Sequence, residues 1–231
     1  MSPVNRPFTI LLLLCAAMPT SATRLDDAVT AMRAGDFAEA YCIMRPLADD
    51  GDPDAQYNIG WMYLNGYGLR INDNLALEWW RKAAQQGHTD ASFSIGMLYS
   101  LGEGEVPKDT DKAIDAYLVA AEDGHDDAII ILKSLIKRND RYMRARLHDI
   151  MDEHASLFGE YRQVKANKLN ARSGPSTSDG IIAQLVKDQI VLVIEQQGQW
   201  SHVVMLENDQ VDQAVWVYTP LLQEVEADRA G

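Results

Sequence analysis

One pattern of small residues recurs three times in the first half of the chain. Each copy begins with Asp or Asn, has Ala four residues later, and ends with Gly fifteen residues after the first position. The first positions are Asp36, Asn72 and Asp109, and the glycines are Gly51, Gly87 and Gly124. The copies are 36 and 37 residues apart. A fixed period of this length is typical of stacked supersecondary units, which bury their apolar faces against one another and present a binding surface.

Each copy predicts a pair of helices. The Asp or Asn suits the N-cap of a helix, where its side-chain oxygen accepts from the first-turn N–H groups. The closing Gly suits the helix end, where it adopts the left-handed conformation without strain. Between the copies lie two matching runs, 55–63 and 91–99, each with Gly at its sixth position. A Gly inside a helix costs about 1 kcal/mol relative to Ala, so the repetition at Gly60 and Gly96 indicates a close contact between helices.

The frame A-x-x-x-x-G-x-x-Y-x-x-G-x-G, followed by Asp or Asn and the Ala positions, resembles the Sel-1-like repeat, a relative of the tetratricopeptide repeat. Residues 55–87 and 91–124 match it, and residues 24–51 give a partial leading unit. After Ala128 the Gly and Tyr positions are occupied by Lys133 and Ile136, so the pattern ends there. The resemblance implies an all-α solenoid of helix pairs over residues 24–138 that binds protein partners.

Residues 139–160 predict a helix that caps the array. Met143, Leu147 and Ile150 follow one another at helical spacing and form an apolar stripe. A second interpretation takes the basic residues around this helix, Arg141 and Arg144 among them, as a docking patch for an anionic partner. His148 and Asp152 share one helix face, but His154 does not, so no metal site is predicted and no cofactor is expected.

After Tyr161 the apolar period changes from 3.6 to 2. Short β-rich runs at 181–185, 190–194, 200–204 and 215–217 are separated by turn residues, as in a small all-β barrel. The segment L-N-x-R-S-G-P-S-T-S at 169–178, with tryptophans in two later runs, resembles the bacterial SH3-like domain. The resemblance covers residues 161–223, and residues 224–231 are expected to be a disordered tail.

Members of that family bind cell-wall peptides or protein segments. The resemblance therefore implies a ligand groove, which we expect to involve Arg172, Trp200, Trp216 and Tyr218. In the alternative interpretation both tryptophans belong to the core of the barrel.

The N-terminus predicts an export signal over residues 1–22. Arg6 precedes an apolar run of 11 residues, 8–18, and small residues follow at 20–22. The run is too short to cross a bilayer, which takes about 20 residues. We expect cleavage after Ala22 and a periplasmic or extracellular protein without an integral membrane segment. The alternative is a lipoprotein anchored through Cys15. Cleavage leaves Cys42 as the only cysteine, which predicts a buried thiol and no disulfide.

The net charge and the absence of catalytic motifs exclude several classes of function. The net charge is −13, and the basic residues are concentrated in a small central band, which argues against nucleic acid as a partner. No nucleophile elbow, P-loop, dinucleotide fingerprint or zinc-protease helix is present, so no catalytic residue is predicted. These observations predict a non-catalytic envelope adaptor, with a protein partner on the repeats and a peptide or peptidoglycan-derived ligand on the barrel. The alternatives are an enzyme or accessory subunit of cell-wall remodelling, and an assembly factor whose barrel merely caps the array.

Overall fold

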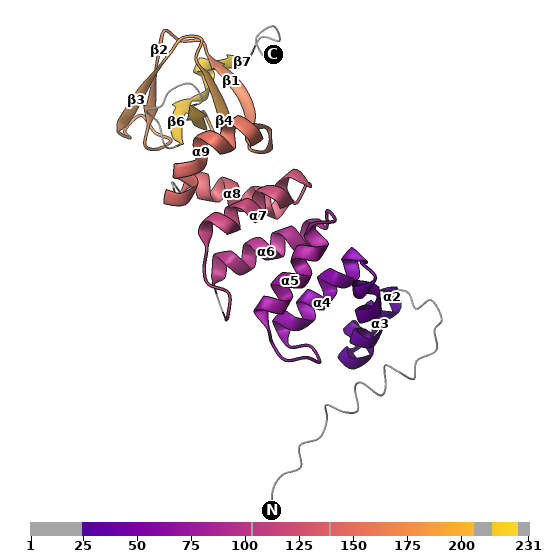
Figure 1. Cartoon of the computed structure of the whole chain (residues 1–231). Helices are drawn as coiled ribbons and strands as arrows, with labels where there is room; N and C mark the ends of the chain where they lie inside the picture. Colours follow the sequence, from indigo (N-terminus) through magenta and orange to yellow (C-terminus); the bar gives the residue numbers. More distant parts are fainter. Residues whose placement is uncertain (1–24, 103, 139, 206–213, 226–231) are drawn as a thin grey trace, which may run out of the picture. The chain divides into compact units, whose positions relative to one another are not determined.

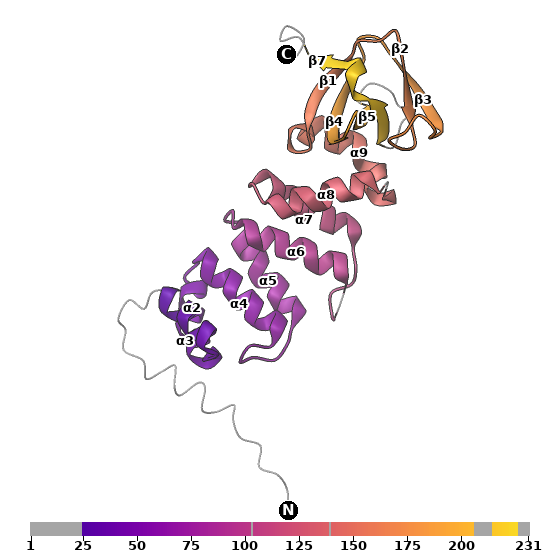
Figure 2. The ribbon, with the colours of Figure 1, turned by 180° about the vertical axis from the view of Figure 1, so that it is seen from behind.

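The computed structural model describes residues 25–102, 104–138, 140–205 and 214–225 (Figures 1 and 2). The chain divides into two compact units between Asp123 and Gly124. The predicted export signal, 1–22, and residues 226–231 of the predicted tail lie outside the described residues. The predicted domain borders at 138/139 and 160/161 stay predictions.

Six helices make up the described part of the first unit, and each contacts the next in chain order (Figure 1). They are α2 (Leu25–Ala34), α3 (Phe37–Asp49), α4 (Pro53–Asn65), α5 (Asp73–Ala84), α6 (Thr89–Leu101) and α7 (Thr110–Glu122). The sequence prediction of helix pairs is confirmed. We call α2, α4 and α6 the first helices of the pairs, and α3, α5 and α7 the second helices.

All three predicted residues are the N-caps of their helices, but one of them lacks the predicted side-chain hydrogen bond. Asn72 accepts from the N–H of Leu75 at 2.9 Å, and Asp109 accepts from the N–H of Lys112 at 3.1 Å. The prediction is wrong for Asp36, whose side chain makes no cap hydrogen bond because its backbone is not in the extended conformation of the other two caps. The three closing glycines all have positive φ, as predicted.

The two glycines inside the first helices lie under aromatic rings of the following second helices. A Cβ on Gly60 would lie 2.4 Å from Nε1 of Trp80, and a Cβ on Gly96 would lie 2.6 Å from Cδ1 of Tyr117. The Trp80 indole N–H also donates to the carbonyl oxygen of Tyr57 at 3.1 Å. The predicted close contact is confirmed, and it is the same contact in both repeats.

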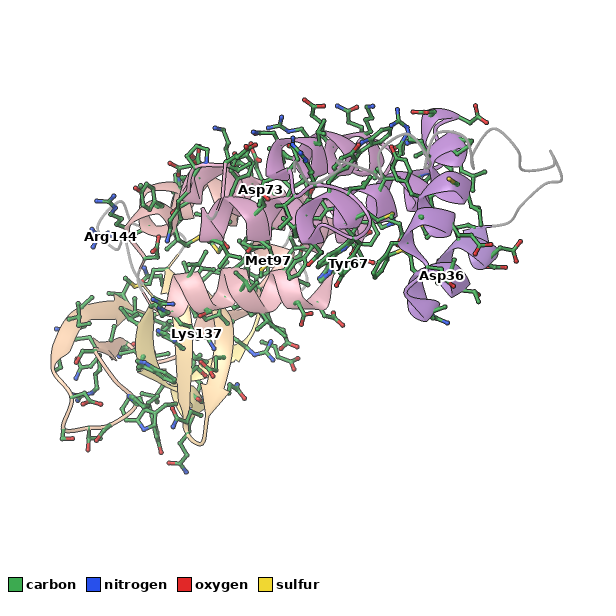
Figure 3. The ribbon with its side chains drawn as sticks, turned by 90° about the horizontal axis from the view of Figure 1, so that it is seen from below. Asp36, Tyr67, Asp73, Met97, Lys137 and Arg144 are labelled. Atoms are coloured by element: carbon green, nitrogen blue, oxygen red, sulfur yellow. The ribbon has the colours of Figure 1, made fainter. Side chains whose placement is uncertain are left out.

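A buried carboxylate fixes the loop after α6. Asp73, the first residue of α5, is 7 % exposed and accepts from the backbone N–H of Glu105 at 2.9 Å (Figure 3). Gly104 comes so close to this carboxylate that no Cβ fits between them. Asn74 adds a side-chain hydrogen bond to the Glu105 carboxylate at 2.9 Å. The loop is therefore held against α5.

Cys42 differs from the prediction. It lies on α3 between the buried positions Ala40 and Ile43, but its own side chain is only partly buried. The expectation of a buried thiol is therefore wrong. The predicted absence of a disulfide also concerns Cys15, which lies outside the described residues. The physical reason for the exposure is the helical period, which turns the side chain two residues after Ala40 away from the buried face.

The second unit combines two helices with one antiparallel sheet (Figures 1 and 2). The helices are α8 (Asp126–Lys137) and α9 (Arg141–His154), followed by the 3₁₀ turn η1 (Ala155–Leu157). The strands are β1 (Glu160–Val164), β2 (Lys168–Arg172), β3 (Ile181–Val186), β4 (Ile190–Gln197), β5 (Trp200–Met205), β6 (Val215–Tyr218) and β7 (Leu222–Glu224), with η2 (Thr219–Leu221) before the last. The strand order is β3-β2-β6-β5-β4-β1-β7.

All seven strands share one apolar core. The core side chains include Val164, Leu169, Leu185, Val191, Val203, Val217 and Leu222, one from each strand. A single core of this kind requires a strongly curled sheet, and the curl is visible in Figures 1 and 2. The sheet is not closed, however: β3 and β7 are its two edges. The predicted strands are confirmed, whereas the predicted closed barrel is not.

The apolar stripe predicted on residues 139–160 is also confirmed. Met143, Leu147, Ile150 and Met151 are the buried residues of α9. Asp140 begins the helix by accepting from the N–H groups of Tyr142 and Met143, at 3.0 and 3.3 Å. Phe158, at the end of η1, is fully buried.

Candidate binding surfaces

The sheet brings four predicted residues onto one face. On β6 the side chains of Val215 and Val217 enter the core, so the alternation places Trp216 and Tyr218 on the opposite face, where Tyr218, at the end of the strand, still packs against the core. Directly paired residues of neighbouring strands project from the same side of a sheet. Trp200 pairs with Tyr218, and Arg172 pairs with Trp216. All four therefore lie on this face, which together with His202 we call the aromatic sheet face.

The rings of the aromatic sheet face contact one another in two pairs. Trp216 stacks on His202 with ring centres 4.4 Å apart and planes 4° from parallel. Trp200 meets Tyr218 edge-on at 5.7 Å. The alternative that Trp216 belongs to the core is wrong, because its neighbours Val215 and Val217 occupy the core positions. The rings of Trp200, Trp216 and Tyr218 are partly exposed, which suits stacking against planar or apolar ligand groups, whereas the His202 ring is buried.

Arg172 is engaged within the protein. Its Nη1 donates to the carbonyl oxygen of Asp179 at 2.6 Å. Beside it the N–H of Ser173 donates to the carbonyl oxygen of Gly180 at 3.0 Å. These two bonds close the loop over 173–180 at the border of the aromatic sheet face. Arg172 is thus a positioning residue for that loop.

The sequence prediction of this neighbourhood did not include His202 and Glu195. His202 pairs with Trp216 on one side and with Glu195 on the other. Glu195 is in turn bridged at 3.2 Å by Nζ of Lys137, the last residue of α8. A β-bulge at Ile194 brings Glu195 into register with His202. The alternation Trp200-Ser-His202 was a signal for His202; nothing in the sequence marks the bulge.

The environment of His202 predicts that the stability of the second unit depends on pH. The His202 side chain is buried, and its Nδ1 has no hydrogen-bond partner among the described residues. Burial lowers the pKa of His202; a hydrogen bond with the Ala214 backbone and the Glu195 charge oppose this to a smaller extent, and the Lys137 charge adds to it. The unfolded chain, with a pKa of about 6.5 for this group, therefore takes up the proton first as the pH falls. The neutral imidazole therefore makes its full contribution to the free energy of unfolding above about pH 6.5. This contribution is lost as the pH falls below that value.

We expect the free energy of unfolding to fall between pH 7 and pH 5.5, with a His202 contribution of at most about 1.4 kcal/mol per pH unit. Urea unfolding at several pH values measures the slope, and His202→Gln is expected to flatten it. An equal slope in the wild type and the variant would contradict this assignment. Carboxylates elsewhere contribute equally to both proteins.

Arg141 and Arg144 lie on α9 and not on the strands that form the aromatic sheet face. Both are exposed on the first turn of α9. The Arg141 guanidinium lies 4.5 Å from the Tyr142 ring centre and donates to the Tyr142 hydroxyl at 2.5 Å. Figure 3 shows Lys137 beside the strands and Arg144 pointing away from them. Lys137 is thus a basic residue of this band that forms an ion pair with the sheet.

His148 and Asp152 form a simple pair on α9. Their closest atoms, Nε2 and Oδ2, are 3.5 Å apart, and both side chains are exposed. Among the described residues no three His, Cys, Asp or Glu side chains gather in a way that suits a metal ion. In the same part of the chain no helix has the length and apolar character needed to cross a membrane.

The first unit presents a second surface, which the sequence prediction did not include. Tyr57 and Trp61 on α4 occupy the same repeat positions as Phe93 and Met97 on α6. All four side chains are partly or well exposed, although each is apolar or aromatic. We call these four residues the repeat face. Their spacing of 36 residues was the signal that could have identified them.

Comparison with known proteins agrees with the repeat geometry. Residues 53–88 and 89–125 each match the family described as Sel1 repeat. The first unit contains Sel1 repeats. Sel1 repeats generally mediate protein–protein interaction and act as non-catalytic scaffolds. No protein with a curated description matches the chain.

Three solved structures are similar to the chain. A Sel1 repeat protein from Oxalobacter formigenes has 22 % identity and a TM-score of 0.47, over 58 % of each chain. A protective antigen of uropathogenic Escherichia coli with an SLR fold has 27 % identity and a TM-score of 0.43, over 52 % of this chain and 24 % of its own. An immunity protein from Pseudomonas aeruginosa has 26 % identity and a TM-score of 0.37, over 52 % and 44 %. The chain thus spans less than two thirds of each.

Proposed function

We propose that the protein is a non-catalytic adaptor of the bacterial cell envelope. Its Sel1 repeats hold a protein partner, and its curled sheet, residues 161–223, is an SH3-like domain that holds a peptide or a peptidoglycan-derived ligand. The segment at residues 1–22 directs it to the periplasm or beyond. Two modules on one chain gain affinity through effective concentration even where each binds weakly.

One observation carries the sheet half of the proposal. The four residues chosen from the sequence, Arg172, Trp200, Trp216 and Tyr218, come from three strands and share one face. The rings on that face are partly exposed, although burying them in the core would stabilise the fold by more. Exposed aromatic rings held in fixed pairs are the usual basis of a recognition surface for peptides and sugars.

The experiment measures retention of two kinds of ligand by the full chain. Purified protein is incubated with isolated peptidoglycan sacculi and sedimented, and in parallel is immobilised to capture proteins from an envelope extract. We expect co-sedimentation with sacculi to fall at least about tenfold in the double variant Trp200→Ala, Trp216→Ala, because two stacking groups are lost. Capture of the protein partner is expected to stay unchanged.

Tyr161→Ala is the matched control, because Tyr161 is an exposed aromatic residue on β1, on the same side of the sheet as Trp200 but separated from it by the whole of β4. It should sediment with sacculi as the wild type does. Retention of neither sacculi nor any envelope protein by the wild type would contradict the proposed function. Equal sedimentation of the double variant and the wild type would contradict the role of the aromatic sheet face.

A further inference from the structure

The two complete Sel1 repeats present the same two positions to solvent. Tyr57 and Trp61 are four residues apart on α4, as Phe93 and Met97 are on α6, so each pair lies on one side of its helix. Met97 is 36 % exposed (Figure 3), and the three aromatic side chains are partly exposed. A repeat needs its apolar residues for packing against its neighbours. Apolar residues left at matched exposed positions are available to a partner.

The rings of the repeat face are held in place from below. Trp61 meets Tyr57 edge-on at 6.4 Å and Trp80 edge-on at 5.9 Å. Phe93 packs on Tyr117, with ring centres 5.7 Å apart. Side chains fixed before binding lose little conformational entropy on binding, which raises the affinity that a given contact provides.

The first residues of α4 and α6 are linked at this face. The His88 ring, which precedes α6, stacks on the Tyr57 ring at 4.5 Å. Its Nε2 lies 3.2 Å from Oδ1 of Asp54, and its Nδ1 accepts from the N–H of Ala91. The Asp54 side chain is nevertheless 62 % exposed. A solvent-accessible carboxylate, that of Asp54, therefore lies next to the aromatic residues of the repeat face.

Charge is distributed unevenly between the two kinds of helix. Neither α4 nor α6 contains Lys or Arg, and each has an Asp three residues before its aromatic residue, namely Asp54 and Asp90. Four basic residues of this unit lie instead on the second helices, Arg45 on α3, Arg81 and Lys82 on α5, and Lys112 on α7. Residues 25–123 together hold 18 acidic against 7 basic residues. The repeat face is thus acidic as well as aromatic.

We propose that the repeat face binds a basic amphipathic helix of the partner protein, an inference that rests on the proposed function of the repeats. Apolar residues of such a helix at i, i+3 and i+4 contact Trp61 and Met97. Its Lys and Arg side chains pair with Asp54 and Asp90 and lie over the neighbouring aromatic rings, where the ring quadrupole attracts a cation. An acidic partner helix would instead be repelled by the like charges of Asp54 and Asp90.

The test uses a defined probe and the full chain. The probe is a fluorescent 18-residue amphipathic peptide with Leu on one helical face and Lys and Arg on the other, and a second peptide has Glu in place of the basic residues. Fluorescence anisotropy measures the Kd. We expect the basic peptide to bind at least tenfold more tightly than the acidic one. The double variant Asp54→Asn, Asp90→Asn is expected to weaken binding of the basic peptide about tenfold, and Met97→Gln to weaken it severalfold.

The matched control distinguishes binding at the repeat face from general electrostatic attraction between a basic peptide and an acidic protein. Glu39→Gln, Glu78→Gln removes two charges from the second helices α3 and α5, and it is expected to leave the Kd within twofold of the wild type. Equal weakening in the two double variants would overturn the proposal. Circular dichroism melts establish that each variant is folded, and Met97→Gln replaces an exposed side chain in case the charge variants are destabilised.

Capture from the envelope extract distinguishes this inference from the proposed function. If the wild type captures a protein partner and the Asp54→Asn, Asp90→Asn variant captures it equally well, the repeats bind a partner but not through the repeat face. If the wild type captures no protein, the proposed function of the repeats itself fails. Loss of capture in this variant alone supports both.

Discussion

Replacing Trp80 by Ala is expected to lower the free energy of unfolding of the Sel1-repeat unit by about 3–5 kcal/mol. The indole is 1 % exposed and covers the backbone of Gly60. Its N–H donates to the Tyr57 carbonyl oxygen at 3.1 Å, and its ring meets Trp61 edge-on. No smaller side chain fills the space between α4 and α5. Guanidinium unfolding followed by circular dichroism measures the change.

Gly60→Ala provides the second half of a double-mutant cycle. In the wild type its Cβ would lie 2.4 Å from Trp80 Nε1, so we expect a cost of about 1–3 kcal/mol for overpacking. In the Trp80→Ala background that contact is absent, and the better helix propensity of Ala, about 1 kcal/mol, should make the change neutral or stabilising. The same cost for Gly60→Ala in both backgrounds would contradict the contact.

Gly159→Ala is expected to destabilise the second unit by about 3 kcal/mol. Gly159 joins the buried Phe158 to β1, and a Cβ there would lie 1.9 Å from the carbonyl oxygen of Val193. The obstacle is backbone, which cannot rotate away as a side chain can. It also lies beside the β-bulge at Ile194, which sets the register of Glu195 with His202. Thermal unfolding and urea unfolding both measure this loss.

Gly180→Ala is the control for Gly159→Ala. Gly180 lies in the same unit, and a Cβ there meets only the Ser173 hydroxyl at 3.8 Å, an ordinary contact distance. Its effect should stay within about 0.5 kcal/mol, as for other substitutions away from packed sites. Similar losses from the two variants would show that glycine conformational freedom, not close approach to Val193, matters at these positions.

The repeat unit could be predicted in detail because its helix caps and glycine–aromatic contacts involve residues close in sequence and occur in both repeats. Gly60 and Gly96 indicated a close helix contact by their spacing alone, and the structure places Trp80 and Tyr117 on them. The caps at Asn72 and Asp109 follow from residue type. Asp36 has the same residue type as Asp109, but its backbone is not in the extended conformation that Asp109 adopts.

Four of the five members of the aromatic sheet face were predicted from the sequence, whereas His202 and the contacts between the members were not. Alternation along β6 indicates that Trp216 and Tyr218 share a face, since successive side chains point to opposite sides. Pairing between strands depends on register, and one extra residue at Ile194 moves Glu195 to the side of His202. No residue type in that strand marks the extra position, so neither this pair nor the bridge to Lys137 could be derived from the sequence.

The sequence also could not predict whether the sheet closes into a barrel. The apolar alternation of the strands is the same in a closed barrel and in a curled open sheet. Closure depends on whether the two edge strands meet. Among the described residues β7 has three residues and pairs only with β1, and β3 pairs only with β2. The repeat face was missed for a different reason: Tyr57 and Trp61 suit a helix core as well as a surface, and only their exposure distinguishes the two.

The most direct test of the account asks whether the Sel1 repeats contact a protein partner in the cell, and on which side. A photo-crosslinking amino acid is placed at position 97 of the full chain, on the repeat face, or at position 78, on the exposed side of α5. After irradiation of the source cells, the account predicts a covalent adduct with a second protein at position 97 and little or none at position 78. No adduct at position 97, or equal adducts at both positions, would contradict it.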